Sequence, residues 1–554
     1  MDTLRSGTES KRKTTPRESS TTFEPSFRKA GLALAAALML GASPTVLAAA
    51  TPADTLVLAD GIDDIVSLDP AEAFEFSGID LLNNTYDSLV ELDPLKPGEL
   101  IPGLAESWSV SDDGLTFTFK MKSGITFASG NPVRAEDAAW SLQRVVKLNK
   151  TPAFILTQFG LTPENVDEMV KAEGDTLTIK IDKPFAPSMF YNCMTAVVAS
   201  VVDKETAMAN EVNGDFGYEW LKTNTAGTGA YVLRSYKPQD SYVLEARPGY
   251  WRGDAKLKRV FMRHVPEGSA QRLLLEKGDI DVARGLTPTD AQGLRGNADV
   301  TIDSDMEGYI YYIAANQKKD PLNNPKVLEA IRYLVDYQGM VDTVLKDQMI
   351  VQQGFLPRGY LGAITDTPYH LDVAKAKALL AEAGFPNGFE TTLSVRNDPL
   401  RMEMAQAIQN TLGQGGIKVT LKPGAGAEVL GDYRARNHDL TLQSWGPDYP
   451  DPHTNASTFA WNPDNSDAAK RTGVLAWRTA WDAGPLTKMV DDAVQERDTE
   501  KRRAMYEEMQ KIHRDTSAFV TMFQQIGVTA RRNNVGNLYT GGTTDQVTYW
   551  YVTK

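Results

Sequence analysis

The chain has 554 residues, of which 42% are hydrophobic and 23% charged, a composition typical of globular proteins. Its length predicts several domains or one very large domain. The formal net charge of −14 argues against nucleic acid and anionic membrane surfaces as partners, and we expect no direct membrane insertion. Patterns typical of helices and strands alternate along the chain, which predicts a mixed α/β fold.

The first 50 residues have the pattern of a secretory signal peptide. Arg28 and Lys29 precede the apolar run "GLALAAALML", which is followed by the small residues of "GASPTVLAAATPAD". The apolar run is too short to span a bilayer. We therefore expect cleavage after Ala48 or Ala50 and a monomeric protein in the periplasm, while a buried helix remains the alternative. No cysteine stands directly after the run, which disfavours a lipid anchor.

Cys193 is the only cysteine in the chain. An intrachain disulfide is therefore impossible. The surrounding sequence "YNCMTAVVAS" is largely apolar, so we expect the thiol to lie in the hydrophobic core.

Residues 104–122 predict a β-hairpin with one buried face. Asp113 and Gly114 form a turn signal between two runs of strand-forming residues. After the turn, apolar and polar residues alternate in the order Leu115, Thr116, Phe117, Thr118, Phe119 and Lys120.

A helix is expected over residues 135–148, directly after this hairpin. Glu136 and Asp137 lie in its first turn, where negative charge favours the helix dipole. Its apolar stripe consists of Ala138, Leu142 and Val145.

Two further helices are predicted in the second half of the chain. Residues 371–384 carry Asp372 as an N-cap and Gly384 as a left-handed terminator. Residues 499–514 carry an apolar stripe at helical spacing, formed by Met505, Met509 and Ile512. We interpret both helices as structural.

The stretch "SWGPDYPDP", residues 444–452, holds two carboxylates on a proline-rich segment. A strand can lead into it, but neither a strand nor a helix can run through it. Asp448 and Asp451 could form a catalytic dyad, although two residues so close on one loop rarely reach the separation of about 5 Å or more that glycoside hydrolysis needs. His438 and His453 flank the stretch and leave a metal site open. Turn formation and ligand anchoring are the other readings.

Motifs of common enzyme families are absent from the sequence. It contains no phosphate-binding loop, dinucleotide fingerprint, HExxH or GxSxG motif. We therefore expect no catalytic residues, no cofactor and no bound metal. A secreted hydrolase remains an alternative, because catalytic triads are not local in sequence.

Several stretches, taken together and in order, resemble the bacterial extracellular solute-binding proteins of family 5. These are the peptide, oligopeptide and nickel receptors of ABC importers. The first stretch is "LAESWSVSDDGLTFTFKMKSGITFASGNPVRAEDAAWSLQR", residues 104–144. The others are "GTGAYVLRSY", "PGYWRG", "LLLEKGDIDVA", "NNPKVLEAIRYLVDYQGMV", "DVAKAKALLAEAGFPNGF" and the loop at 444–452. The resemblance covers essentially the whole chain after the signal segment.

Three positions depart from the family pattern. Arg134 stands where the family usually has a Thr or Ser helix cap, and arginine cannot accept hydrogen bonds from the helix N–H groups. Ala230 replaces the proline of "GTGPY", and Leu328 replaces an arginine. These changes concern local structure.

The resemblance implies a two-lobed clamshell of the type II periplasmic-binding-protein class, in the large form with an extra subdomain. Ligand would lie between the lobes and close them, as interdomain clefts and hinge motions commonly allow. The implied division assigns residues 51–90, 226–310 and 519–554 to lobe I, residues 91–225 to the extra subdomain and residues 311–518 to lobe II.

The resemblance also implies which residues hold the ligand. Dipeptide-binding members use an Asp after a Trp to bind the ligand α-amine, and Trp445, Gly446 and Asp448 match that pattern. An Asp in a desolvated cleft accepts charge-assisted hydrogen bonds from an ammonium group. Trp445 would line the cleft, and Tyr449 would line it or pack outward. Asp451 is interpreted as structural, capping the turn.

Two other segments complete the implied site. Arg396 follows a strand-like run and would pair with a ligand carboxylate through its planar fork, with a structural role as the alternative. The loop at 72–80 follows the strand "TLVLAD", and Phe76, Ser77 and Gly78 would offer backbone groups to the ligand. Binding of an extended peptide would then resemble strand addition.

The function implied is capture of a di- or oligopeptide and its delivery to an ABC permease in the inner membrane. A non-peptide solute, such as a glycoside, an opine-like conjugate or a metal chelate, is the alternative within the same fold. A secondary role as a periplasmic chaperone or signalling module also remains open.

Overall fold

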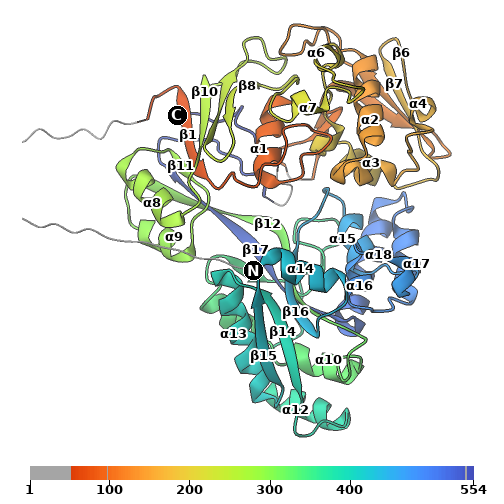
Figure 1. Cartoon of the computed structure of the whole chain (residues 1–554), viewed down its shortest axis with the longest axis vertical. Helices are drawn as coiled ribbons and strands as arrows, with labels where there is room; N and C mark the ends of the chain where they lie inside the picture. The colour runs from red at the N-terminus through yellow and green to blue at the C-terminus, as the bar shows by residue number, and fades with distance from the viewer. Residues whose placement is uncertain (1–50, 97, 543–545) are drawn as a thin grey trace, which may run out of the picture. The chain divides into compact units, whose positions relative to one another are not determined.

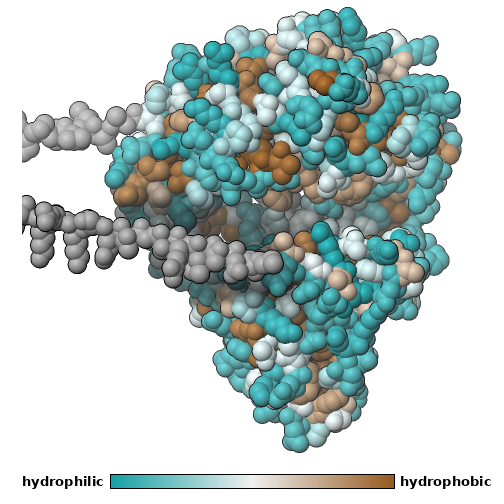
Figure 2. Space-filling view, viewed as in Figure 1, coloured by the Kyte–Doolittle hydropathy of each residue, from teal (hydrophilic) through white to brown (hydrophobic). Residues whose placement is uncertain are grey.

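The computed structural model describes residues 51–96, 98–542 and 546–554 (Figure 1). The predicted signal segment, residues 1–50, lies outside the described residues. Within the described ranges, no helix is both long and apolar enough to cross a membrane. The face shown in Figure 2 is mainly hydrophilic, with apolar residues scattered among the polar ones.

A large mixed sheet runs through most of the described chain. It is built from early, central and late segments, as the wide range of colours along it in Figure 1 shows. Its strands follow the order β15 (Lys418–Gly424), β14 (Glu390–Arg396), β16 (Leu440–Trp445), β12 (Val300–Ala315), β17 (Phe519–Arg532), β11 (Val282–Ala283), β1 (Thr55–Asp60), β10 (Arg259–His264), β9 (Ser241–Ala246) and β8 (Tyr231–Lys237), with β13 (Met349–Val351) also paired to β17.

The long antiparallel pair β12 and β17 joins the two halves of this sheet. Residues 310–315 of β12 also pair with β16, whereas Arg531 and Ala530 of β17 pair with β11. The register between β12 and β17 shifts between Met306 and Ile310, so that β12 has extra residues at this point. Such a bulge turns side chains away from the regular alternation of a strand.

A smaller antiparallel sheet confirms the predicted hairpin and helix. It contains β4 (Ala105–Val110), β5 (Thr116–Met121), β7 (Thr176–Lys180) and β6 (Val170–Glu173), and α2 (Ala135–Leu148) packs against β6 and β7. Phe117 and Phe119 are fully buried, as their alternation predicts. The predicted stripe of α2 is buried as well, at Ala138, Leu142 and Val145.

The two other predicted helices are also confirmed. Helix α12 (Val373–Glu382) begins after Asp372, whose carboxylate accepts the Lys375 N–H at 2.9 Å. Gly384 has a φ of +91° just beyond its end, which ends the helix at low cost because glycine lacks a Cβ. Helix α18 (Thr499–Thr516) extends two residues beyond the predicted end.

The remaining helices and strands complete the layers around the sheets. They are α1 (Phe76–Thr85), β2 (Val90–Leu92), β3 (Leu100–Pro102), α3 (Phe154–Thr157), α4 (Val166–Met169), α5 (Pro187–Cys193), α6 (Lys204–Ala209), α7 (Tyr218–Leu221), α8 (Gly268–Lys277), α9 (Pro288–Leu294), α10 (Pro325–Arg332), α11 (Tyr337–Asp342), α13 (Pro399–Gln414), α14 (Gly426–Arg434), α15 (His453–Phe459), α16 (Leu475–Arg478) and α17 (Pro485–Ala493), with 3-10 turns at Thr151–Ala153, Val197–Ala199 and Asp467–Ala469.

One hydrophobic cluster connects segments that are distant in the sequence. It is formed by buried residues between 71 and 201, together with Tyr449 and Val494. Cys193 belongs to this cluster and is fully buried, which confirms its expected place in the core. The residues around the small sheet therefore pack against the loop that follows β16.

We expect Asp372→Ala to lower the free energy of unfolding by about 1 kcal/mol, because it removes the N-cap bond of α12. Urea unfolding measures the change. Arg134→Ala is the matched control, since Arg134 stands at the N-cap of α2, is exposed and makes no side-chain cap bond. Equal losses in the two variants would contradict a stabilising role for the Asp372 cap.

Candidate functional site

The loop after β16 is fixed at both ends by regular structure. Trp445 is the last residue of β16 and pairs with Ile310 of β12, and α15 begins at His453. The predicted strand therefore leads into the loop and stops, as the prolines require.

Asp451 forms a buried ion pair with Arg502 of α18. Both side chains are about 1% exposed, and the guanidinium donates to the two carboxylate oxygens at 2.7 Å each. Burial alone would raise the pKa of Asp451, but the Arg502 charge and its hydrogen bonds outweigh burial and lower that pKa. The carboxylate also accepts the His453 N–H at 2.9 Å. Asp451 thus has the structural role expected of it, with an ion pair that sequence reasoning missed.

Asp448, three residues earlier, has a different environment. Its backbone N–H donates to the Thr454 hydroxyl at 3.0 Å, and the same hydroxyl lies 3.5 Å from its carboxylate. No cationic side chain pairs with it among the described residues. Burial raises its pKa to about 7, and the Thr454 hydrogen bond opposes that shift. Asp448 is therefore a partly buried carboxylate that would gain most from a cationic ligand group.

Two aromatic rings lie next to Gly446 of this loop, namely those of Tyr309 and, behind it, Phe76. A Cβ at Gly446 would lie 3.0 Å from the Tyr309 ring, so glycine allows the ring to approach the backbone. The Tyr309 ring in turn lies 5.4 Å from the Phe76 ring, centroid to centroid. Trp445 adds a buried indole N–H that has no hydrogen-bond partner in the described part of the chain. Sequence reasoning missed Tyr309, because it comes from the distant strand β12.

Arg396 ends β14, in the position predicted for it. Its Nε is buried without a hydrogen-bond partner in the described ranges. Burial lowers the pKa of Arg396, and the neighbouring Arg401 charge lowers it further. The nearby Asp398 bonds to Arg401 at 3.0 Å, which leaves Arg396 available to an anionic group.

The prediction of a loop over residues 72–80 is wrong in its second half. Phe76, Ser77 and Gly78 form the first turn of α1, which has no side-chain cap bond from Glu75. The first-turn N–H groups of a helix have no partner within the helix, so these residues keep backbone donors although they are helical. The Ser77 hydroxyl donates to the Gly61 carbonyl at 3.1 Å.

Tyr449 packs into the core, and this corrects the expectation that it lines the cleft or packs outward. Its side chain is 5% exposed and belongs to the hydrophobic cluster around the small sheet. Its hydroxyl donates to Gln158 at 3.4 Å. The physical reason is that an apolar ring at this position gains more from burial than from exposure to a cleft.

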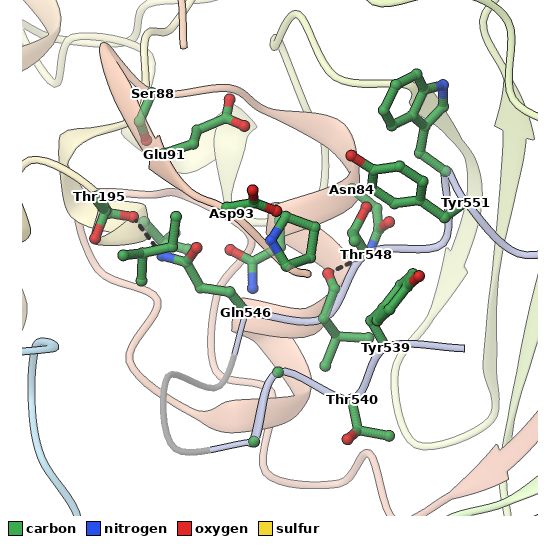
Figure 3. Close-up of a pocket in the computed structure, with 18 of the residues that line it drawn as sticks. Asn84, Ser88, Glu91, Asp93, Thr195, Tyr539, Thr540, Gln546, Thr548 and Tyr551 are labelled. Atoms are coloured by element: carbon green, nitrogen blue, oxygen red, sulfur yellow. Dashed lines mark hydrogen bonds between the residues drawn. The ribbon is translucent and has the colours of Figure 1, made fainter. Parts of the chain in front are cut away.

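Two neighbouring cavities lie in the described part of the protein. The first has a volume of about 390 Å³ and is shown in Figure 3. Glu91, Asp93, Asn84 and Tyr551 line it, and Glu91 pairs with Arg252 at 2.6 Å. Burial raises the pKa of Glu91 to about 8, although Arg252 opposes the shift.

The second cavity has a volume of about 230 Å³ and includes Phe76 and Tyr309 in its lining. Its charged groups are those of Asp60, Arg284, Asp305 and Glu307. The two cavities share the lining residues Asp305, Thr540, Gly542 and Val547. The other predicted ligand-contacting residues line neither cavity. Sequence reasoning missed these cavities because their walls come from distant segments.

The two histidines that flank the loop are buried. Burial lowers the pKa of His438 to about 3 and that of His453 to about 4, so both imidazoles are neutral near pH 7. The His438 ring contacts the Tyr433 ring at a centroid distance of 5.0 Å. The described residues contain no group of three or more His, Cys, Asp or Glu side chains placed to hold a metal ion.

Comparison with known proteins places the chain in a family. The model for "Bacterial extracellular solute-binding proteins, family 5 Middle" matches residues 99–467. The "Probable D,D-dipeptide-binding periplasmic protein DdpA" of Escherichia coli (strain K12) is 30% identical over 496 residues, which cover 88% of this chain and 92% of that protein. Heme-binding protein A of Haemophilus influenzae is 29% identical over 397 residues, covering 66% of this chain and 70% of that protein.

A solved structure has the same fold. The periplasmic binding protein DppA from Helicobacter pylori, in complex with the peptide STSA, superposes with a TM-score of 0.73 at 24% identity. The match covers 90% of this chain and 98% of that one. The chain belongs to family 5 of the bacterial extracellular solute-binding proteins, which confirms the resemblance and the predicted fold class. It is a solute-binding protein of the ABC importer type and not an enzyme.

We expect Asp451→Asn to lower the free energy of unfolding by about 3–5 kcal/mol, because it leaves the Arg502 guanidinium buried and uncompensated. Urea unfolding measures this loss. Asp448→Asn is the matched control on the same loop, and it removes a carboxylate that has no cationic partner among the described side chains. A loss of similar size in Asp448→Asn would contradict the different roles of the two acids.

Proposed function

We propose that this protein captures a di- or oligopeptide in the periplasm and delivers it to an ABC permease of the inner membrane. The observation that carries the proposal is a pair of charged groups without partners among the described residues. Asp448 is a partly buried carboxylate without a cation, and Arg396 has a buried Nε without an acceptor. A peptide carries one ammonium and one carboxylate, and therefore supplies both missing charges.

In this proposal each residue has a distinct role. Asp448 accepts the ligand α-ammonium, and Arg396 pairs with its carboxylate through a planar fork. Trp445 and Phe76 provide apolar surface, and Gly446 allows backbone approach. The free N–H groups in the first turn of α1, at Ser77 and Gly78, donate to peptide carbonyls.

The relatives support a peptide without excluding other solutes. The DdpA relative is named for D,D-dipeptides, whereas a second relative is named for heme. A non-peptide solute of the kind expected from the sequence therefore remains the second candidate. A ligand without an amine would leave the Asp448 carboxylate without a cationic partner. Whether binding depends on a ligand amine therefore separates a peptide from a non-peptide solute. Mass spectrometry of solute that co-purifies from the native periplasm identifies the ligand directly.

We further propose that the signal segment directs export and that the mature protein acts as a monomer. The acidic formal charge and the absence of a membrane-spanning helix in the described ranges accord with an exported receptor. N-terminal sequencing of the secreted protein tests cleavage after Ala48 or Ala50, and light scattering measures its mass in solution.

Asp448→Ala is expected to weaken peptide binding by about 2–5 kcal/mol, because the ligand ammonium would lose its buried carboxylate partner. This corresponds to an affinity loss of about thirtyfold to several-thousandfold. Titration calorimetry with the identified ligand measures it. Asp303→Asn, on strand β12 outside the site, serves as the control, and an unchanged affinity in Asp448→Ala would remove Asp448 from the site.

Peptide affinity should depend on pH through the raised pKa of Asp448. Below its pKa of about 7 the carboxyl is protonated in the ligand-free protein, so binding an ammonium must first remove that proton. Affinity should fall by about tenfold per pH unit below that value. It should also fall above about pH 8, where the peptide α-amine loses its proton.

Calorimetric titrations across this pH range test the prediction. In Asp448→Asn the decline at low pH should disappear, since the amide does not titrate. A wild-type affinity that stays constant from about pH 7 down to about pH 5 would show that Asp448 does not control binding.

A further inference from the structure

The second cavity lies where parallel strands of the large sheet end. Strand β1 pairs in parallel with both β10 and β11. Asp60 is the last residue of β1, and Arg284 follows directly after β11. Ligands of open α/β sheets bind in the crevice outside the carboxyl ends of such strands. Asp60 and Arg284 both line the cavity.

The arginine of this cavity already has a buried partner. The Arg284 guanidinium donates to the Asp80 carboxylate, whose side chain is 4% exposed. The Tyr549 hydroxyl donates to the same carboxylate at 2.7 Å. The Arg284 Nε is farther from Asp60, at 3.7 Å. One positive charge is thus matched by Asp80, and the remaining carboxylates of the cavity lack a cation of their own.

Glu307 is held at the cavity by specific contacts. Its carboxylate accepts the Gln525 amide at 2.6 Å. A Cβ at position 527 would lie 2.1 Å from the Glu307 Oε1, so Gly527 leaves the space that the carboxylate occupies. Burial raises the pKa of both Glu307 and Asp60, and the Arg284 charge opposes both shifts. The cavity therefore has excess negative charge that an added cation would compensate.

Two aromatic rings form another wall of this cavity. Phe76 is 43% exposed, which is unusual for such a large apolar side chain, and its ring lies 5.4 Å from that of Tyr309. Aromatic faces beside carboxylates favour ammonium and guanidinium groups. Tyr309 also contacts Gly446 of the proposed peptide site, so the cavity lies beside that site.

We propose that this cavity receives a basic side chain of the captured peptide, an alkylammonium or guanidinium group, between the Phe76 and Tyr309 rings and the Glu307 and Asp60 carboxylates. The inference rests on the proposed peptide function and adds the side-chain class that the receptor selects. The cavity volume of about 230 Å³ is below the ~300–1,000 Å³ of sites for whole small ligands, so it suits a side chain. Acidic side chains are disfavoured by the same carboxylates.

Matched dipeptides test the inference. Lys-Ala is compared with norleucyl-alanine, and Ala-Lys with alanyl-norleucine. Norleucine has the same aliphatic chain as lysine without the ammonium group. With lysine at one of the two peptide positions, the lysine dipeptide should bind about tenfold to a hundredfold more tightly than its norleucine counterpart in titration calorimetry. In Glu307→Gln, this lysine preference should fall to about threefold or less, while norleucine peptides keep their affinity.

Two further variants locate the effect. Gly527→Ala keeps the Glu307 charge but displaces its carboxylate, and should reduce the lysine preference. Asp303→Asn is the matched control, because Asp303 lies on strand β12 like Glu307. It pairs with Arg531 at 2.5 Å and is not among the residues that line the cavity. It should keep the full preference.

The outcomes separate this inference from the function on which it rests. Equal affinities for lysine and norleucine peptides in both positions would overturn the basic-side-chain inference and leave peptide capture standing. A lysine preference that persists in Glu307→Gln would also overturn it. Failure of every peptide to bind the wild-type protein would overturn the peptide function and this inference with it.

Discussion

The antiparallel pairing of β12 with β17 is the constraint on which the candidate site depends. These two strands connect the part of the sheet around β14 and β16 with the part around β1 and β11. Their register shifts between Met306 and Ile310, and the extra residues include Glu307 and Tyr309. Both of these residues line the second cavity, so this irregular stretch of β12 contributes a carboxylate and an aromatic ring to its wall.

Buried charged groups in this protein fall into two kinds. Some are matched within the chain, as in Asp451 with Arg502, Asp69 with Arg144 and Asp80 with Arg284. Removing one partner from such a pair is costly, so these pairs hold the segments that they join. The second kind, represented by Asp448 and Arg396, forms no direct ion pair with the described side chains, although Asp398 lies near enough to Arg396 to act on its charge. Burial removes water from these two groups, and no ion pair within the chain replaces it. A zwitterionic solute would therefore gain most of its binding free energy at them.

Local sequence signals predicted the elements whose causes are local. The turn at Asp113 and Gly114, the stripe of α2 and the cap at Asp372 were all read correctly, because each depends on neighbours within a few residues. Helix α1, which begins within the predicted loop, was missed, since its first turn has no side-chain cap to indicate it. The burial of Tyr449 and the approach of Tyr309 to Gly446 were missed too. Both depend on partners that lie more than a hundred residues away, which a single sequence does not reveal. The division into lobes and the ligand contacts stay predictions.

The buried position of Cys193 has a consequence for the reactivity of its thiol. The thiol is fully enclosed, and burial raises its pKa well above the ordinary value, so very little reactive thiolate forms in the folded state. Two copies therefore cannot form an intermolecular disulfide through this residue while both stay folded. Once the core around the small sheet opens, the thiol becomes accessible. The rate at which a thiol reagent labels Cys193 therefore measures how often that core unfolds.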